Sequence, residues 1–441
     1  MMSGIRTRLI LVAVGVLSTV SICRAAESEP MTSEQRQLNL AAFDQVWTTI
    51  HDKHFDSTFG GLDWEAVQTE LRPKVEQAEG AEETRRIIED MLSRLGLSHL
   101  GIIPATLYND IDDEPVPGDA GGITGLDARV IEGKALVTYV ADNSPAQAAG
   151  VGLGWEIVRI GGKELAPILQ PLAAEYAGRR MLEWYLIRAV TSRLKGVIGD
   201  TVTVLFDDGA GKQVEKNLPL IQNPGKKTTF GDLPPFYLTI RTDTLPGNIG
   251  YFAFSCFFDP LTLMTAFNEF MQSSMERRGI IIDVRGNPGG YGMIGMGMGG
   301  WLVAEKNLYL GTMSTRDTQL KMIINPRAQV YSGPVAVLVD GLSASSSEML
   351  AGGLQDIGRA RVFGTRTLGA ALPSTITRLS NGDGFQYVFA DYVSRGGQRL
   401  EGRGVIPDEE VFLTRETLLQ GHDAVIDAAR QWIEAQNSDK E

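Results

Sequence analysis

Apolar residues recur every three or four positions through the first part of the chain. This spacing is typical of amphipathic helices that bury one face, and it is clearest in Leu40, Phe43, Val46, Trp47 and Ile50. A glycine pair at residues 60–61 separates two such segments, and Asp63 is placed to cap the second one. We therefore predict an N-terminal helical bundle over residues 32–105.

Shorter apolar runs follow, and turn residues separate them. Residues 202–206 and 214–218 flank the polar, glycine-rich stretch 207–211, which predicts a β-hairpin. A helix-like insertion rich in leucine, alanine and aromatic residues lies at residues 164–193. Residues 118–221 are therefore predicted to form a β-domain, and this pattern alone also fits a generic small β-fold.

After a linker at residues 226–235, continuous apolar runs alternate with helical patterns. Such runs are typical of strands buried on both faces, and they occur near residues 249, 280, 335 and 362. Helical spacing is found at residues 261–274, 291–303 and 348–354, and in a closing segment at 417–436. Alternation of this kind predicts an α/β layer with partly parallel strands. Residues 236–436 are therefore a third domain of a multidomain α/β chain.

The first 26 residues are predicted to be a signal peptide. Arg6 and Arg8 precede an apolar run at residues 9–22 that is too short for a stable membrane span, and small residues follow. We therefore expect an exported protein, periplasmic or secreted. Cys23 leaves lipoprotein anchoring as an alternative, although the bulky Ile22 before it makes a poor lipidation motif. The mature chain would keep Cys256 alone, which excludes an internal disulfide.

The net charge and the positions of the histidines argue against two classes of function, nucleic-acid binding and metal binding. The net charge of −13 argues against nucleic-acid binding, because phosphate recognition needs a basic surface. His51 and His54 lie three residues apart without a further ligand cluster nearby, so we expect polar groups at a helix end and no metal site. No nucleotide or other cofactor site is visible, and the expected partners are protein or peptide substrates.

The stretch with the clearest chemical character is rich in serine. Residues 340–347 follow an apolar run at 334–339 and precede a helical pattern that begins at Glu348. A strand-to-helix turn can expose one hydroxyl and point helix N–H groups at negative charge that develops there. An ordinary serine-rich N-cap is the alternative. A second buried strand, at residues 279–283, runs into a glycine-rich turn.

These two stretches resemble the S41 family of serine peptidases, which includes carboxy-terminal processing proteases and tricorn core proteases. The matching motifs are DVRGNPGG at residues 283–290, SASSSE at 343–348 and QDIGR at 355–359. The resemblance implies a ClpP/crotonase-like α/β core in the third domain. It also implies Ser345 as the nucleophile, with an oxyanion hole formed by Ser346 and by Gly289 or Gly290. Asp283 and Arg285 are expected to be a structural ion pair.

The general base separates two branches of this family. In the processing proteases the base is a lysine, and the matching position here is Ala370, while Arg366 is too basic to serve. The pair Ser98-His99 is similar to that of the tricorn type, in which histidine is the base, and Glu401 matches the family's glutamate. A neutral imidazole suits proton transfer near pH 7. For Glu401, a surface loop carboxylate is the alternative.

Residues 118–221 resemble a PDZ module. The resemblance implies that the loop containing Gly122, Ile123, Gly125 and Leu126 binds a peptide carboxylate. Trp155 replaces the usual aspartate of this module, which weakens the expectation of ordinary PDZ ligands.

The whole pattern predicts an exported serine endopeptidase of the tricorn-like type that acts on unfolded or C-terminally recognised proteins. Two alternatives stay open. One is a catalytically inactive protein that binds peptides or other ligands on the same fold, and the other is a hydrolase of non-peptide acyl substrates.

Overall fold

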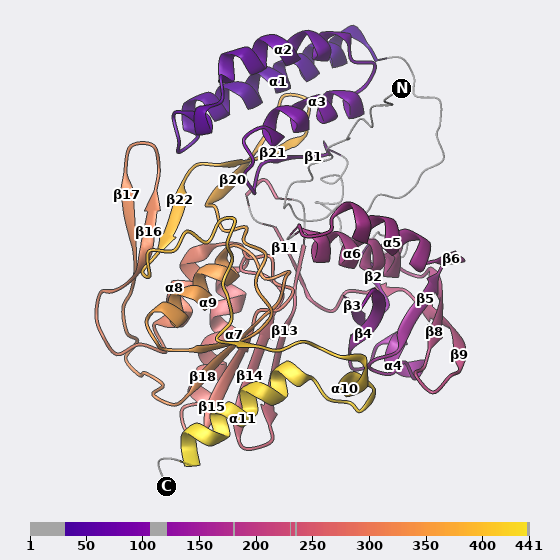
Figure 1. Ribbon diagram of the computed structural model, residues 1–441, viewed down its shortest axis with the longest axis vertical. Helices are drawn as coiled ribbons and strands as arrows, with labels where there is room; N and C mark the ends of the chain where they lie inside the picture. The colour runs from indigo at the N-terminus through magenta and orange to yellow at the C-terminus, as the bar shows by residue number, and fades with distance from the viewer. Residues whose placement is uncertain (1–30, 106–120, 180, 230, 234–235, 439–441) are drawn as a thin grey trace, which may run out of the picture.

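The computed structural model describes residues 31–105, 121–179, 181–229, 231–233 and 236–438. The predicted signal peptide lies outside them. Three parts are visible in Figure 1: helices at the top, a β-domain at the right and an α/β layer below. Within the described residues, no helix combines the length and the apolar character that crossing a bilayer requires.

The helical part begins as the sequence predicts. It contains α1 (Ser33–Lys53), α2 (Trp64–Gln77) and α3 (Ala81–Ser93), with a short 3-10 turn at Phe59–Gly61. The Asp63 side chain caps α2 by accepting a hydrogen bond from the Ala66 N–H. This confirms the predicted N-cap.

A distant segment of the chain completes the core of the helical part. Leu372, Phe385 and Val388 pack among the buried residues of α1–α3. They belong to or adjoin a small antiparallel sheet of order β1-β21-β20, made of β1 (Gly101–Ile103), β21 (Gly384–Val388) and β20 (Ser374–Arg378). The helices therefore do not close a core alone, since residues 372–388 supply one side of it.

The β-domain is an antiparallel sheet of order β3-β4-β5-β8-β9. Its strands are β3 (Leu126–Ile131), β4 (Lys134–Val140), β5 (Glu156–Ile160), β8 (Thr201–Asp207) and β9 (Gln213–Pro219), with β6 (Lys163–Glu164) paired to β5. The predicted hairpin is confirmed as β8 and β9. The insertion forms α5 (Ala166–Glu175) and α6 (Leu182–Thr191), and α4 (Pro145–Ala148) and a 3-10 turn (Ser192–Leu194) are shorter. A second sheet places β2 (Gly122–Ile123) between β10 (Ile221–Gln222) and β7 (Lys195–Gly196).

A six-stranded sheet of order β13-β14-β15-β18-β19-β23 forms the third part. Its strands are β13 (Ile240–Leu245), β14 (Ile249–Phe254), β15 (Gly279–Asp283), β18 (Val335–Val339), β19 (Arg361–Gly364) and β23 (Glu409–Glu410). All neighbours pair in parallel except β13, which is antiparallel to β14. The sheet thus confirms the predicted layer with partly parallel strands.

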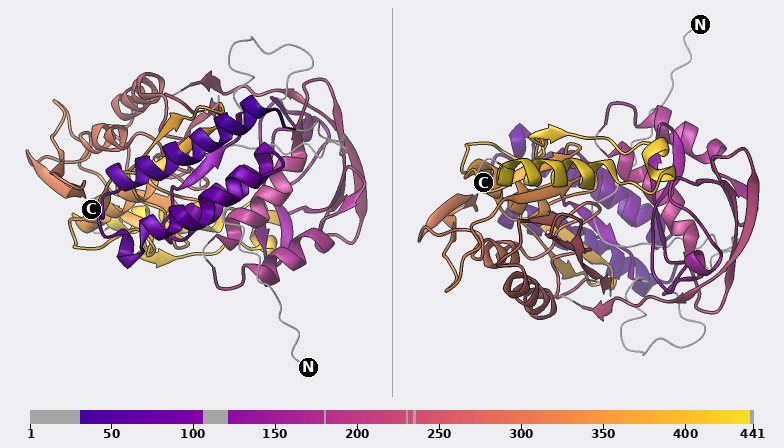
Figure 2. Two further views of the ribbon diagram at one scale, coloured as in Figure 1. Left: turned by 90° about the horizontal axis from the view of Figure 1, so that it is seen from above. Right: turned by 90° about the horizontal axis from the view of Figure 1, so that it is seen from below.

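Helices cover both faces of this sheet. On β15, Ile280 and Ile282 pack with α7 (Pro260–Ser273), α8 (Gly292–Gly299) and α9 (Ser346–Asp356). Ile281 points the other way and packs against α11 (Ala424–Ser438), which crosses the opposite face (Figure 2). Burial on both faces explains why the strands read as continuous apolar runs.

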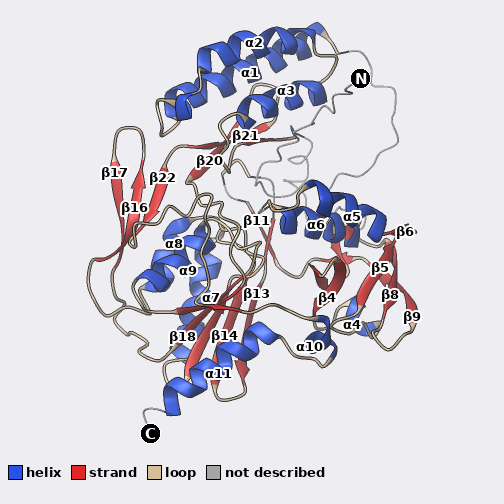
Figure 3. Cartoon of the chain, viewed as in Figure 1, coloured by secondary structure: helices blue, strands red, loops and turns tan. Residues whose placement is uncertain are grey.

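The remaining elements lie around this layer. A three-stranded sheet contains β16 (Leu308–Ser314), β17 (Gln319–Ile324) and β22 (Asp391–Ser394) (Figure 3). A two-stranded ribbon pairs β11 (Lys226–Thr228) with β12 (Phe236–Leu238). The closing helix predicted at 417–436 is divided into α10 (Arg415–Leu419) and α11. Gly421 has a φ of +80° and lies between them, a conformation that a helix cannot continue through.

Candidate active site

Two loops meet at the carboxyl ends of β15 and β18. Since these strands are parallel neighbours, the loops that follow them lie side by side, which is where α/β proteins commonly place their sites. The Ser343 hydroxyl donates to the Val284 carbonyl (2.7 Å). The Ala344 N–H (3.1 Å) and the Ser347 hydroxyl (2.9 Å) both donate to the Asn287 carbonyl. The loop after β18 (residues 340–347, the serine turn) and the loop after β15 (residues 284–290, the glycine loop) are thus fixed to one another.

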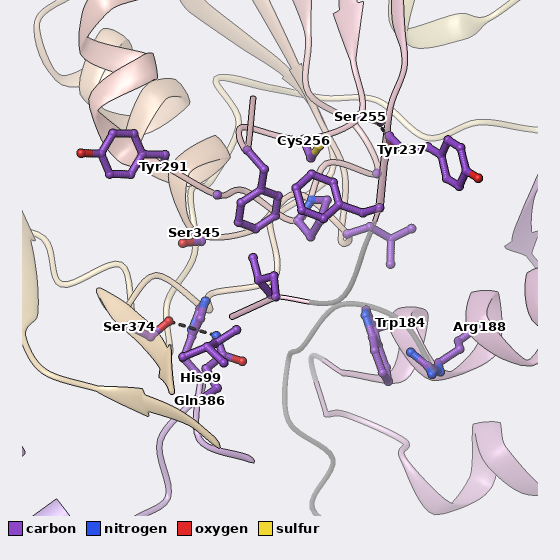
Figure 4. Close-up of a pocket in the computed structure, with 18 of the residues that line it drawn as sticks. His99, Trp184, Arg188, Tyr237, Ser255, Cys256, Tyr291, Ser345, Ser374 and Gln386 are labelled. Carbon is purple, nitrogen blue, oxygen red and sulfur yellow. Dashed lines mark hydrogen bonds between the residues drawn. The ribbon is translucent and has the colours of Figure 1, made fainter. Parts of the chain in front are cut away.

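Ser345 lies at the sharpest point of the serine turn, directly before α9. Its backbone has φ +54° and ψ −116°, a strained conformation for a residue other than glycine. Its N–H donates to the Ala370 carbonyl at 2.7 Å. Ser345 lines a cavity of about 520 Å³, shown in Figure 4. Strain of this kind is found at functional sites.

Glu348 fixes this turn from inside the protein, and sequence reasoning missed it. Its carboxylate accepts four hydrogen bonds: from the Thr367 hydroxyl (2.6 Å) and the N–H groups of Gly369 (2.7 Å), Ser345 (3.0 Å) and Ala370 (3.0 Å). Burial raises the pKa of Glu348 to about 7, while these hydrogen bonds act to lower it. The spacing S-x-x-E from Ser345 to Glu348 was the available signal, because it is that of a capping box.

His99 enters the same cavity from the other side, at the amino end of β1. Its Nδ1 lies 2.7 Å from the Ser98 hydroxyl oxygen. That hydroxyl donates to Glu401 Oε2 (2.9 Å), and the Ser98 N–H donates to Glu401 Oε1 (3.0 Å). The Ser98 hydroxyl donates its one proton to Glu401, so it must accept the hydrogen bond from His99. The proton of that bond is therefore on His99 Nδ1, and the neutral imidazole has its free acceptor at Nε2.

The surroundings of His99 keep it neutral. Only 5% of its surface is exposed. Burial lowers the pKa of His99 to about 4, because desolvation penalises the imidazolium. Glu401 Oε2, which accepts from the Ser98 hydroxyl, also accepts from the Ala371 N–H at 3.0 Å. The structure thus joins the adjacent residues Ser98 and His99 to Glu401, which lies 303 positions after Ser98 in the sequence.

The N–H groups predicted to form the oxyanion hole differ in whether they already have an acceptor within the protein. The Gly289 N–H donates to Asn287 Oδ1 at 2.9 Å. In the described part of the chain, the N–H groups of Gly290 and Ser346 have no protein acceptor. The two loops are in close contact here, since a Cβ added to Gly289 would lie 2.7 Å from Ser345 Cβ. Gly290 and Ser346 are therefore the two open donors beside Ser345.

Neighbouring charged residues support these loops. Arg285 pairs with Asp283 (2.7 Å), and the Tyr251 hydroxyl donates to the same carboxylate (2.7 Å), which confirms the expected structural ion pair. Arg129 of β3 pairs with Asp340 at the start of the serine turn (3.1 Å). This contact between the β-domain and the turn was not predicted, because the two residues are 211 positions apart.

Part of the loop that was predicted to bind a peptide carboxylate is paired with neighbouring strands. Gly122 and Ile123 form β2 and pair with β10 on one side and β7 on the other. The Gly125 carbonyl accepts from the Ala141 N–H (2.7 Å), and Leu126 begins β3.

The remaining residues considered for chemistry have structural surroundings. The described residues hold no group of three or more potential metal ligands, and His51 and His54 stack on aromatic rings at the end of α1. Cys256 is a buried free thiol in the cavity wall, and burial raises its pKa to about 11.

Comparisons with known proteins follow the same division of the chain. Residues 248–411 match the model of peptidase family S41, and residues 39–93 match that of the tricorn protease C1 domain. The chloroplastic carboxyl-terminal-processing peptidase 3 of Arabidopsis thaliana is 26% identical over 383 residues, which cover 82% of this chain and 67% of that protein. The carboxyl-terminal-processing protease of Synechocystis sp. is 26% identical over 373 residues, which cover 83% of this chain and 79% of that protein.

A solved structure shares the fold. The photosystem II D1 C-terminal processing protease matches with a TM-score of 0.53 and 22% identity, covering 90% of this chain and 99% of that chain. The region matched by the family model contains both the glycine loop and the serine turn. Residues 248–411 thus match peptidase family S41, and the chain is a peptidase of the serine type, similar over most of its length to carboxyl-terminal-processing peptidases.

Proposed function

We propose that the chain is an endopeptidase in which Ser345 is the nucleophile and His99 the general base. The observation that carries this proposal is the hydrogen-bonded series from Glu401 through Ser98 to His99, which ends in the cavity that Ser345 lines. A serine hydroxyl becomes a nucleophile when an oriented base takes its proton. The series supplies that orientation.

The reaction divides into acylation and deacylation. His99 Nε2 takes the proton of the Ser345 hydroxyl as its oxygen attacks the scissile carbonyl carbon. The resulting oxyanion is held by the N–H groups of Ser346 and Gly290, the two open donors. His99 then gives the proton to the leaving amine, and water hydrolyses the acyl-enzyme by the reverse proton path. Glu401 acts through Ser98 to stabilise the imidazolium.

Ala370, the residue that matches the catalytic lysine of the processing proteases, supports histidine as the general base. Ala370 has no ionisable side chain, and its main chain is used on both sides: its N–H donates to Glu348 and its carbonyl accepts from Ser345. The position therefore serves to hold the serine turn. The match of residues 39–93 to the tricorn C1 domain also supports the tricorn-like branch.

The proposed substrates rest on the named relatives, and the proposed location rests on the predicted signal peptide. We propose that the substrates are unfolded or C-terminally recognised proteins, because the named relatives process carboxyl termini. The β-domain acts in this proposal as a PDZ-like module that recruits chain ends. Export to the periplasm or the cell exterior is proposed from the leader at residues 1–26.

The test is cleavage of an unfolded model protein, β-casein, by the wild type and by the variants Ser345→Ala and His99→Ala. Each substitution is expected to lower kcat/KM by about 10³-fold or more, since members of such a set act as a unit. His422→Ala, at an exposed histidine, is the matched control and should keep full activity. If the folded wild type cleaved neither peptides nor esters and a fluorophosphonate left Ser345 unlabelled, the ligand-binding alternative would replace this proposal.

A further inference from the structure

Helix α8 has no polar side chain, although part of it reaches the surface. Its eight residues are all glycine, methionine or isoleucine. A helix that is apolar all round is normally buried, and Ile294 and Met298 do lie in the core. Met293, in contrast, is 54% exposed, and Tyr291 directly before the helix is 46% exposed. The amino-terminal turn of α8 therefore presents apolar side chains to solvent.

Helix α7 presents another apolar side chain close to this turn. Leu261, in the first turn of α7, is 76% exposed, more than any other large apolar residue in the described part of the chain. The two helices begin side by side, because Phe257 and Gly290 form a parallel bridge just before them and the Tyr291 N–H donates to the Phe257 carbonyl at 2.7 Å. The exposed ends of α7 and α8 are thus neighbours.

The packing of the two helices shows which faces meet. Met264 of α7 faces Gly297 of α8, since a Cβ added to Gly297 would lie 3.5 Å from the Met264 sulfur. The helices run in the same direction, because they follow the parallel strands β14 and β15. Side chains three or four positions apart share a helix face, so Leu261 and Met293 lie about one turn before this contact, on the same faces. We define the α7–α8 patch as Leu261, Met264, Tyr291 and Met293.

The α7–α8 patch adjoins the active-site cavity. Tyr291 belongs to both, because it also lines the cavity, and Phe258 lines the cavity just before α7 begins. The other members of the patch are not among the described residues that line the cavity. Figure 4 shows Tyr291 on the side of Ser345 away from Trp184. A polypeptide that leaves the cavity at Tyr291 therefore passes over the patch.

We propose that the α7–α8 patch binds apolar side chains of the substrate polypeptide outside the active-site cavity. The proposal rests on the proposed function and specifies the substrate class as unfolded chains with apolar residues near the scissile bond. Methionine is flexible and polarisable, so such a surface accommodates different apolar side chains. Exposed apolar surface of this kind marks interaction sites, and folded proteins are disfavoured because they bury most of their large apolar side chains. The patch positions the substrate, and the chemistry stays with Ser345 and His99.

The first experiment compares substrates that reach the patch with one that does not. A hexapeptide that spans the main β-casein cleavage site is extended with the natural β-casein sequence, on its amino or on its carboxyl side. Each extension is also made with its apolar residues replaced by serine. One of the two natural extensions is expected to raise kcat/KM about tenfold, through burial of apolar side chains, and its serine version is not. If neither extension raised kcat/KM, or if the serine versions acted equally, the proposal would be wrong.

The second experiment changes the enzyme. The double variant Leu261→Gln/Met293→Gln keeps similar side-chain sizes and makes the patch polar. It is expected to lose the preference, about tenfold, for the extended over the short peptide. Ile406→Gln is the matched control, because Ile406 is 48% exposed and its carbonyl accepts from Gln355 near the end of α9 remote from Ser345. A double variant with the wild-type preference would overturn the proposal.

The other occupant of such a patch would be a second copy of the chain. Sedimentation velocity of the wild type and of Leu261→Gln/Met293→Gln separates the two cases. The proposal expects the same oligomeric state for both proteins. An oligomer that dissociates in the double variant would assign the patch to an interface between copies and would overturn the proposal.

The inference and the proposed reaction can fail separately. Binding of fluorescein-labelled β-casein is measured by anisotropy in the Ser345→Ala background, which needs no turnover. Binding that is about tenfold weaker when Leu261→Gln/Met293→Gln is added keeps the inference, even if the wild type cleaves nothing. Equal binding removes the inference, and cleavage that depends on Ser345 would then leave the reaction standing.

Discussion

The burial of His99 sets the pH range of the proposed reaction. A general base must be neutral, and burial lowers the pKa of His99 to about 4. We therefore expect kcat/KM to remain high well below pH 6.5, the usual value for histidine, and to decline as the pH approaches 4. The measurement is kcat/KM on a peptide substrate from about pH 3.5 to about pH 8, with circular dichroism at each pH as the control for unfolding. A decline centred near the usual histidine value would contradict it.

Glu348 makes a prediction about stability. Its pKa rises from 4.5 in the unfolded chain to about 7 in the folded protein, so the folded state binds the extra proton between these values. The stability from Glu348 is therefore fully present below pH 4.5 and is lost as the pH rises through 7. Glu348→Gln removes the titration, so the difference in unfolding free energy between wild type and variant should change between about pH 5 and about pH 8.

The measurement is the urea midpoint of both proteins across this range. Since the introduced amide group meets N–H donors where a carboxylate oxygen was, the variant is also expected to lose about 1–3 kcal/mol near the acid end of the range. A pH-independent difference between the two proteins would show that Glu348 has the same protonation in both states.

At the scale of elements, the contact between the glycine loop and the serine turn depends on Gly289. It has φ +95°, and an added Cβ would lie 2.7 Å from the Ala344 carbonyl oxygen. Gly289→Ala is expected to separate the loops, to lower kcat/KM by about 10²-fold and to destabilise the protein by about 2–4 kcal/mol. Thermal unfolding and peptide cleavage measure the two effects.

Gly358 offers the matched control for this substitution. It also has a positive φ, +68°, but an added Cβ would meet nothing within 4 Å. Gly358→Ala therefore introduces backbone strain alone, which costs about 1 kcal/mol, and activity should be unchanged. If both variants behaved alike, strain rather than contact would explain the effect at Gly289.

These elements also show what the sequence could reveal. Strands buried on both faces are seen in the sequence as continuous apolar runs, so the α/β layer could be predicted. The serine turn and the glycine loop carry recognisable motifs, so Ser345 could be predicted as well. The break before α11 and the capping role of Glu348 have local sequence signals: a glycine at position 421 within a helical pattern, and the S-x-x-E spacing from Ser345 to Glu348. No sequence signal showed which of the predicted oxyanion donors are open. The hydrogen bond from the Gly289 N–H to Asn287 depends on the final loop geometry.

In the molecule as a whole, the site is formed by segments that lie far apart in the sequence, so the sequence alone does not reveal that they are in contact. His99 follows the helical part, Ser345 and Glu401 lie in the α/β part, and α6 of the β-domain contributes Trp184 to the cavity wall. Side-chain pairing across some 300 residues leaves no periodicity in a single sequence. The association of Ser98 with Glu401 could therefore be expected only from family resemblance, and the Arg129–Asp340 pair not at all.

The same long-range assembly predicts that activity depends on contacts far from the cavity. Arg85 of α3 donates two hydrogen bonds of 3.0 Å to Asp383, which also accepts from the Ala105 N–H (2.8 Å). This carboxylate is buried, with 1% of its side chain exposed. Arg85→Met leaves it without its cation and is expected to cost about 3–5 kcal/mol. Because Asp383 ties α3 and the end of β1 to the β20–β21 turn, the sheet that carries His99 should loosen relative to Ser345.

We expect kcat/KM of Arg85→Met to fall under conditions in which the protein is still folded, as judged by circular dichroism. The double variant Arg85→Met/Asp383→Asn removes the unpaired charge and should regain part of the lost stability, since an isolated buried carboxylate is the costly species. If it regained stability but not activity, the ion pair would serve to position His99. If the single variant kept both, the helical part would hold its place through its apolar core alone, in which Leu372 and Phe385 pack against α1–α3.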